Sequence, residues 1–305
     1  MANLDKYHGV IPAFYACYDP QGEVSPERTR KLARNLVNKG VKGLYVGGSS
    51  GECIYLEKEE RMRTLEAVMN EVKGECAVIA HVACNNTRES CQLAAHAESL
   101  GVDAIASIPP IYFRLPDRAI ANYWNTISAA APKTDFIIYN IPQLAGVALS
   151  LNLFREMRRN PRVIGVKNSS MPTQDIQMFK HEGGDDCVVF NGPDEQFVAG
   201  RAIGADGGIG GTYAVMPELF LKMDSYLKEN KFQQAQPIQN AVNDIILAMC
   251  GCEGNLYAVM KRILLLREGL ELGSVREPMP ALTAADLPKT EVCAQMIDEA
   301  IAKYC

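Results

Sequence analysis

The chain has 305 residues, a formal net charge of −5, 22% charged residues and 48% hydrophobic residues. This composition is typical of a globular protein and excludes a disordered or fibrous chain. Because the charge balance is acidic and no apolar run approaches the roughly 20 residues of a membrane span, we expect neither a nucleic-acid partner nor a membrane partner.

The amino-terminal segment MANLDKYHGV lacks the basic and apolar regions of a secretory signal peptide, so we expect a cytoplasmic protein. Ten cysteines are spread along the chain, and only Cys250 and Cys252 stand close together. Because no CxxC pair or regular spacing is present, we predict free thiols rather than disulfides. His and Cys never cluster at the spacing of metal ligands, so we predict no zinc site.

Short apolar segments rich in Val and Ile recur along the first two thirds of the chain. Continuous apolar runs of this length are typical of strands that are buried on both faces. We predict strands at Val10–Tyr15, Gly43–Val46, Ala77–Val82, Ala104–Ile108, Phe136–Tyr139, Val163–Lys167, Val188–Phe190 and Gly207–Ile209.

Amphipathic patterns separate these strands. They predict helices at Glu27–Lys39, Glu57–Val72, Thr87–Leu100, Asp117–Ala131, Leu151–Arg158, Thr173–His181 and Asp194–Ile203. The first of these helices has Ser25 as an N-cap and Pro26 at its first position, and Gly40 stops it. Eight strand–helix units favour a (β/α)8 TIM barrel over an open doubly wound sheet. The segment Ala13–Asp19 has no glycine-rich nucleotide loop, so we expect no dinucleotide site.

Strand signals stop near residue 230. The remaining sequence predicts three helices, at Phe232–Met249, Asn255–Leu270 and Ala284–Lys303. No flexible linker precedes them. We therefore predict a barrel over residues 1–230 and a C-terminal extension of three helices over residues 231–305, packed on the barrel.

A polar loop, GGSSGE (47–52), follows the second predicted strand. Its glycines leave backbone N–H groups accessible, and Ser49 and Ser50 add two hydroxyl groups. Such a loop suits a small anion, because several hydrogen-bond donors converge on it. An ordinary glycine–serine turn is the alternative interpretation.

The sixth predicted strand ends in a lysine. Alternation places Val163, Gly165 and Lys167 on one face of this strand. The branched residues Ile164 and Val166, on the other face, suit the layer of helices, so we predict that Lys167 points into the barrel mouth. A desolvated lysine there has a lowered pKa and forms a Schiff base with a ketone. A solvated lysine at a loop edge is the alternative.

The fifth predicted strand ends in a similar way. Ile137 and Tyr139 share a face, so the Tyr139 phenol is predicted near the same mouth as the lysine. A phenol beside an iminium is suited to move a proton. A core tyrosine is the alternative.

Two further strand ends carry polar or bare backbone groups. Asp194 and Glu195 follow the seventh strand, where they either stabilise the start of the next helix or bind the hydroxyl groups of a polyol. The segment GIGGTY (208–213) lies at the end of the eighth strand, and its glycines leave the backbone there uncovered by side chains. Since active sites of such barrels lie at the carboxyl ends of the strands, these groups indicate one converging site.

Together these segments resemble the dihydrodipicolinate synthase and N-acetylneuraminate lyase family of class I pyruvate aldolases. The resemblance extends from Gly9 to the C-terminal helices, with the motifs in the family's order and spacing. They are GGSSGE (47–52), YNIP (139–142), GVKNSS (165–170), FNGPDE (190–195) and GIGGTY (208–213). The resemblance implies a barrel enzyme, usually a homotetramer, that needs no metal or organic cofactor.

The resemblance also implies roles for individual residues. Lys167 matches the Schiff-base lysine, and Tyr139 matches the catalytic tyrosine. Ser49 and Ser50 match the pair that binds the pyruvyl carboxylate. Ser169 matches a hydroxyl that orients the C4 oxygen of the substrate.

Further matches lie at the sugar end of the implied substrate. Gly192, Asp194 and Glu195 match the residues that hold the hydroxylated tail. Gly211 stands near the sugar where some lyases carry a serine, so one possible contact is absent. Tyr112, in the segment PPIY (109–112), matches a tyrosine that in related enzymes reaches the site of a neighbouring subunit.

The sequence also separates branches of this family. Dihydrodipicolinate synthases typically carry an arginine shortly after the YN-P motif, where this chain has Leu144, which cannot pair with a second carboxylate. The sequence therefore favours reversible cleavage of N-acetylneuraminate to N-acetyl-D-mannosamine and pyruvate, in sialic acid catabolism. The alternatives are dihydrodipicolinate synthesis, cleavage of a 2-keto-3-deoxy sugar acid, or non-catalytic binding of a keto acid.

Overall fold

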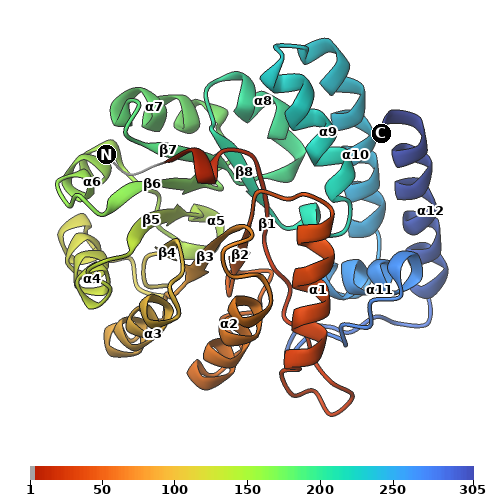
Figure 1. Cartoon of the computed structure of the whole chain (residues 1–305), viewed down its shortest axis with the longest axis horizontal. Coiled ribbons are helices and arrows are strands. Elements are labelled where there is room, and N and C mark those ends of the chain that lie inside the picture. Colours follow the sequence, from red (N-terminus) through yellow and green to blue (C-terminus); the bar gives the residue numbers. More distant parts are fainter. Residues whose placement is uncertain (1–3) are drawn as a thin grey trace.

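The computed structural model describes residues 4–305 and contains a ring of parallel strands surrounded by helices (Figure 1). Residues 1–3, which open the segment considered for a signal peptide, lie outside the described residues. All eight predicted segments contain a strand. The strands are β1 (Val10–Pro12), β2 (Gly43–Val46), β3 (Ala77–His81), β4 (Ala104–Ser107), β5 (Asp135–Asn140), β6 (Val163–Asn168), β7 (Val188–Asn191) and β8 (Gly207–Gly210).

The strands pair in the order β1-β8-β7-β6-β5-β4-β3-β2. The two ends of this sheet meet just beyond β1, where Ala13 forms a parallel bridge with Tyr45 of β2. The backbone N–H of Phe14 donates to the Tyr45 carbonyl at 2.9 Å, and the N–H of Lys42 donates to the Val10 carbonyl at 2.9 Å. These contacts close the sheet and confirm the predicted (β/α)8 TIM barrel.

The predicted barrel helices are present with small changes at their ends. They are α1 (Pro26–Asn38), α2 (Lys58–Val72), α3 (Thr87–Leu100), α4 (Asp117–Ala130), α6 (Leu151–Arg158), α7 (Thr173–Gly183) and α8 (Phe197–Ala202). A 3-10 turn, η2 (Asp194–Gln196), forms the start of the helix predicted from Asp194. The cap of α1 is as predicted, since the Ser25 side chain accepts from the Arg28 N–H and Pro26 takes the first position.

Among residues 4–305, two α-helices were not predicted: α5 (Pro142–Ala145) and α9 (Pro217–Lys228). Both begin with a proline at the first helical position, and α9 also has Glu218 in its first turn. These are ordinary start signals of a helix. The helix α9 completes the outer ring after β8.

The C-terminal quarter of the chain forms α10 (Phe232–Cys250), α11 (Leu256–Glu268) and α12 (Leu287–Tyr304). These helices lie together on one side of the barrel, next to α9 and α1 (Figure 1). No helix within residues 4–305 is both long enough and apolar enough to span a membrane.

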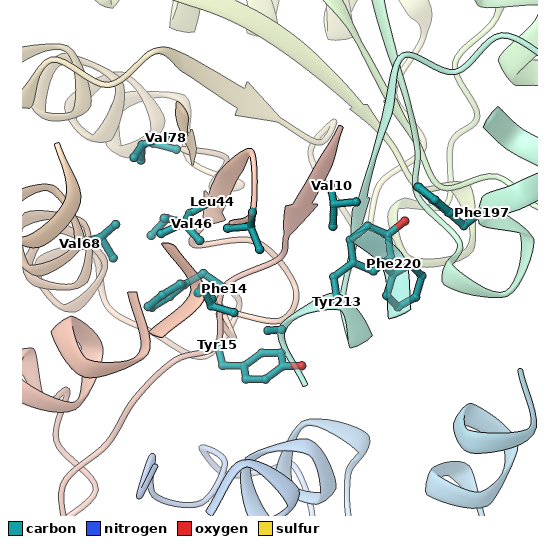
Figure 2. Packing of buried hydrophobic residues seen from close by; sticks show 14 of the residues in the cluster. Val10, Phe14, Tyr15, Leu44, Val46, Val68, Val78, Phe197, Tyr213 and Phe220 are labelled. Carbon is teal, nitrogen blue, oxygen red and sulfur yellow. The ribbon is translucent and has the colours of Figure 1, made fainter. Parts of the chain in front are cut away.

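Most buried hydrophobic residues of the described chain belong to one of two layers. One layer lies between the strands and the helices, where Figure 2 shows Leu44 and Val46 of β2 near Val68 of α2. The other layer fills the barrel, as expected for a packed interior. Its members include Ile11, Tyr45, Ile79, Ile137, Tyr139, Ile164 and Ile209.

The strand β6 departs from the predicted alternation. Phe136 of β5 pairs with Val163, but the next residue, Ile137, pairs with Gly165, so β6 contains a bulge at Ile164. Val163 therefore packs in the outer layer and Ile164 packs inside the barrel. The prediction for these two residues was wrong, because a bulge leaves no signal in a simple alternating pattern.

The residue after the bulge must be a glycine. A Cβ atom on Gly165 would lie 1.9 Å from the carbonyl oxygen of Val188 in β7. Beyond the bulge the expected alternation holds, because Val166 packs in the outer layer and Lys167 points into the barrel. The bulge therefore sets the direction of the lysine.

Candidate active site

A cavity of about 330 Å³ lies at the carboxyl ends of the strands. All of the predicted site residues line it except Tyr112. They are Ser49, Ser50, Tyr139, Lys167, Ser169, Gly192, Asp194, Glu195 and Gly211. The barrel thus brings together groups that are far apart in the sequence.

Lys167 lies between two aromatic rings and is 4% exposed. Its Nζ atom is 3.9 Å from the ring centroid of Tyr139 and 4.2 Å from that of Tyr45. Burial lowers the pKa of Lys167 to about 7, and the nearby Asp194 carboxylate opposes this effect. At neutral pH an uncharged, nucleophilic amine is therefore far more common at Lys167 than at an ordinary solvated lysine.

The phenol of Tyr139 is buried beside this amine. Burial raises the pKa of Tyr139 to about 12, while hydrogen bonding with Ser49 and Ser169 acts in the opposite direction. The Tyr139 hydroxyl is therefore protonated at neutral pH, and two other hydroxyl groups surround it. Such a group can pass a proton between a ligand and its neighbours.

The serine loop, which we define as residues 47–52, forms a turn that is closed by hydrogen bonds from its own backbone N–H groups. The N–H groups of residues 51–53 donate to the carbonyl groups of residues 48 and 49 at 3.0–3.3 Å. The N–H groups of Ser49 and Ser50 have no hydrogen-bond partner in the described part of the chain. These two N–H groups are thus available for an anion, and the Ser49 and Ser50 hydroxyl groups, which interact with Tyr139 and Tyr257, lie beside them.

Asp194 is buried and holds two loops together. Its Oδ2 atom accepts hydrogen bonds from the backbone N–H and the hydroxyl of Thr212, both at 2.7 Å. Burial raises the pKa of Asp194 to about 6. Its Oδ1 atom is buried without a hydrogen-bond partner among residues 4–305. Asp194 therefore links the end of β7 to the loop after β8.

The neighbouring Glu195 differs from it. Its side chain is exposed, and its carboxylate has no hydrogen-bond partner among the described residues. Of the two acids at this strand end, Glu195 is the one whose carboxylate oxygens are both free for a ligand.

Ser169 is fixed by close packing. Its backbone N–H donates to the Asn140 carbonyl at 2.7 Å. A Cβ atom on Gly192 would lie 2.0 Å from the Ser169 Oγ atom, so only glycine fits opposite this hydroxyl. At Gly211, a Cβ atom would lie 3.3 Å from the Ser50 Oγ atom. A side chain there would press on the serine loop.

Two tyrosines near the site were not selected from the sequence. Tyr45 lies within the apolar run of β2 and looks like an ordinary core residue. Tyr257 lines the cavity from α11, and its hydroxyl interacts with Ser50. Because α11 is not part of a strand–helix unit, no strand-end pattern pointed to it.

Tyr112 lies away from this cavity and is 89% exposed. Its ring packs edge-to-face on Phe113, with 4.9 Å between the ring centroids. The expectation that it serves the site of a neighbouring subunit concerns a contact that a single chain does not contain.

Within residues 4–305, no group of three or more His, Cys, Asp or Glu side chains is arranged to hold a metal ion. All ten cysteines are free. The chemistry available in the cavity is that of an amine, a phenol, hydroxyl groups and carboxylates.

A closed parallel barrel with a buried, deprotonatable lysine at its carboxyl end defines a (β/α)8-barrel enzyme of the Schiff-base type. Residues 6–297 match the dihydrodipicolinate synthetase family. The chain belongs to this family.

The chain is similar to several proteins named as N-acetylneuraminate lyases or sialic acid aldolases. The chain is 63% identical over 304 residues to the N-acetylneuraminate lyase of Mediterraneibacter gnavus, covering 100% of this chain and 96% of the relative. It is 33% identical over 289 residues to an N-acetylneuraminate lyase of Escherichia coli, covering 95% and 96%. The solved structure of wild-type Ruminococcus gnavus sialic acid aldolase is 63% identical, with a TM-score of 0.98 over 98% of this chain and 100% of that one.

Proposed function

We propose that the protein is a Schiff-base aldolase that reversibly cleaves N-acetylneuraminate into N-acetyl-D-mannosamine and pyruvate. The observation that carries this proposal is the buried Lys167 amine, 3.9 Å from the Tyr139 ring and in one cavity with the serine loop. The two relatives named as N-acetylneuraminate lyases and the sialic acid aldolase structure support the same reaction.

The reaction begins with binding of the open-chain sugar acid. Its carboxylate accepts hydrogen bonds from the hydroxyl and N–H groups of Ser49 and Ser50. The uncharged Lys167 amine attacks the C2 carbonyl, and loss of water gives an iminium. The iminium then accepts the electron pair that is released when the C3–C4 bond breaks.

Bond cleavage requires loss of the C4 hydroxyl proton. Because the Tyr139 hydroxyl is protonated, it takes this proton as it passes its own proton to the substrate carboxylate. Ser169 orients the C4 oxygen. N-acetyl-D-mannosamine leaves as the aldehyde. The proton held on the carboxylate returns through Tyr139 to C3 of the remaining enamine, and hydrolysis of the resulting iminium releases pyruvate and the Lys167 amine.

The competing reaction in this family is condensation of pyruvate with aspartate semialdehyde. It requires a cation for the second carboxylate, but Leu144 lines the cavity where the synthases carry an arginine. Two assays should be run side by side. One measures the release of pyruvate from N-acetylneuraminate through a coupled reaction that oxidises NADH, and the other measures the condensation. We expect activity only in the first. Activity only in the second would overturn the proposed function.

The rate of Schiff-base formation should depend on pH through Lys167. Its pKa is lowered to about 7, so the reactive amine is lost below that value. We expect trapping of pyruvate by cyanoborohydride to level off above pH 7 and to fall about tenfold per pH unit below the pKa. Initial rates measured from pH 5 to 10 check this. A rate that still climbs above pH 9 would indicate an ordinary, solvated lysine.

We expect Glu195 to favour substrates that are long enough to carry a hydroxylated tail. A hydrogen bond to a charged group contributes about 1.5–3 kcal/mol, so Glu195→Ala should lower kcat/KM for N-acetylneuraminate roughly 10- to 150-fold. Trapping of pyruvate should be unchanged, because pyruvate has no hydroxylated tail. Both quantities are measured on the same preparation.

Asp194→Ala is the informative comparison for this variant. It releases Thr212 as well as any ligand contact, so we expect it to weaken both assays. Equal losses in both assays for Glu195→Ala would mean that Glu195 also supports the loop structure, and the specificity argument would fail.

We also propose that the protein is a cytoplasmic homotetramer in which Tyr112 of one subunit reaches the site of a neighbour. Tyr112 is 89% exposed and Phe113 is 71% exposed. An exposed aromatic pair of this kind is typical of an interaction surface. The mass in solution, measured by light scattering, tests this assembly.

A further inference from the structure

A buried ion pair lies directly behind the serine loop. Glu52, the last residue of that loop, has a side chain that is 0% exposed, and that of Lys261 on α11 is 1% exposed. The Lys261 Nζ atom donates to the Glu52 Oε1 atom at 2.7 Å. Neither group lines the cavity that holds Lys167. The proposed reaction therefore leaves both charges without a role.

The remaining polar atoms of this pair are also satisfied. The Glu52 Oε2 atom accepts from the Tyr18 hydroxyl and from the Arg276 backbone N–H, both at 2.8 Å. Lys261 donates a second hydrogen bond to the Ser274 carbonyl at 2.6 Å. The carboxylate thus ties the serine loop to the segment after β1, to α11 and to the segment after α11.

The backbone of Glu52 supports the same view. Glu52 has φ +56°, in the left-handed region that side chains rarely occupy. Such a conformation persists where surrounding contacts hold it. Here the three hydrogen bonds to the carboxylate supply those contacts, so the end of the serine loop is held in one arrangement.

The helix α11 contacts the loop at two points. Tyr257 and Lys261 are four residues apart and therefore lie on one face of the helix. The Tyr257 hydroxyl interacts with Ser50, and Lys261 binds Glu52 two residues further along the loop. Both contacts would move together if α11 shifted.

A purely stabilising role explains this pair poorly. Two charges lose their hydration on burial, and a well-packed apolar pair of similar size is often as stable or more stable. A charge pair does, however, fix distance and direction between the groups that carry it. Because the pair lies next to Ser49 and Ser50, a fixed distance and direction between its groups would also fix the position of these serines.

We infer that Glu52 and Lys261 are positioning residues, which hold the serine loop where Ser49 and Ser50 can bind the carboxylate of the keto acid. This inference rests on the proposed function and deepens it, since it names the device on which keto-acid affinity depends. The reacting amine of Lys167 is held by β6 and is independent of the pair.

The test separates carboxylate binding from the chemistry of the amine. We expect Glu52→Gln and Lys261→Met to raise the pyruvate concentration for half-maximal borohydride trapping roughly 10- to 100-fold. The trapping rate at saturating pyruvate should change little. Trapping of acetone, a ketone without a carboxylate, should be the same in the variants and the unaltered protein.

Two controls keep the outcome readable. Asp224→Asn breaks another largely buried ion pair, with Arg201, outside the cavity, and should leave half-saturation unchanged. If either charge variant fails to fold by circular dichroism, Glu52→Asp keeps the charge but shortens its reach, and should again weaken pyruvate alone.

Each possible result has a distinct meaning. Unchanged half-saturation in a folded variant, or equal losses for pyruvate and acetone, would overturn the inference in favour of a merely structural pair. Failure of the unaltered protein to trap pyruvate on Lys167 would overturn the proposed function, and this inference with it.

Discussion

Lys167→Ala should abolish both the trapping of pyruvate and the cleavage of N-acetylneuraminate. None of the other described residues that line the cavity carries an amine, and a Schiff base cannot form without one. The fold should persist, because the substitution removes a buried ionisable group rather than part of the apolar core. Mass spectrometry after treatment with pyruvate and borohydride, followed by peptide mapping, should place the adduct of the unaltered protein on residues 163–168.

Other lysines provide the comparison. Lys133 is exposed, so Lys133→Ala should trap pyruvate normally. Lys261 is buried in an ion pair with Glu52 and does not line the cavity, so it is not placed to attack a ketone bound there. An adduct on Lys42, Lys133 or Lys261 would overturn the assignment of the nucleophile.

Tyr139→Phe should lower kcat roughly 10²- to 10⁴-fold, the usual contribution of a placed proton-transfer group. The ring that packs on the lysine is kept, so stability and pyruvate trapping should change little. Because the hydroxyl acts when the C3–C4 bond breaks, the loss should appear in cleavage of the full substrate. Steady-state kinetics and thermal unfolding of the same sample measure the two effects.

Tyr45→Phe is the matched control. Tyr45 is also buried and also packs on the Lys167 amine, but it does not line the cavity. Removal of the Tyr45 hydroxyl in this variant should leave kcat nearly unchanged. An unchanged kcat for Tyr139→Phe would instead assign the proton transfer to Ser169 or to a water molecule.

The fold could be predicted because strands buried on both faces leave continuous apolar runs, and eight of them recur with helices between. The bulge in β6 could not be predicted, since Ile164 is apolar and suits either face of the strand. The helix α9 was missed although Pro217 and Glu218 gave it a start signal.

Those residues of the candidate site that lie at the carboxyl ends of strands could be predicted from the sequence. Parallel strands of a barrel end at one edge, so the lysine, the phenol and the serine loop had to meet. The structural role of Asp194 could not be read from the sequence, because its partner Thr212 belongs to another loop. The same holds for Tyr257 and for the Glu52–Lys261 pair, which depend on how α11 packs.

The contact of α11 with the serine loop also has a consequence for biosynthesis. A ribosome completes the barrel strands, with Lys167 and Tyr139, well before it reaches residues 256–276. Until that stretch has emerged, the Glu52 carboxylate of the loop lacks two of its three hydrogen-bond donors, the Lys261 amine and the Arg276 N–H. The growing chain therefore contains Lys167 before it contains the two residues of the C-terminal helices and loops that hold the Glu52 carboxylate.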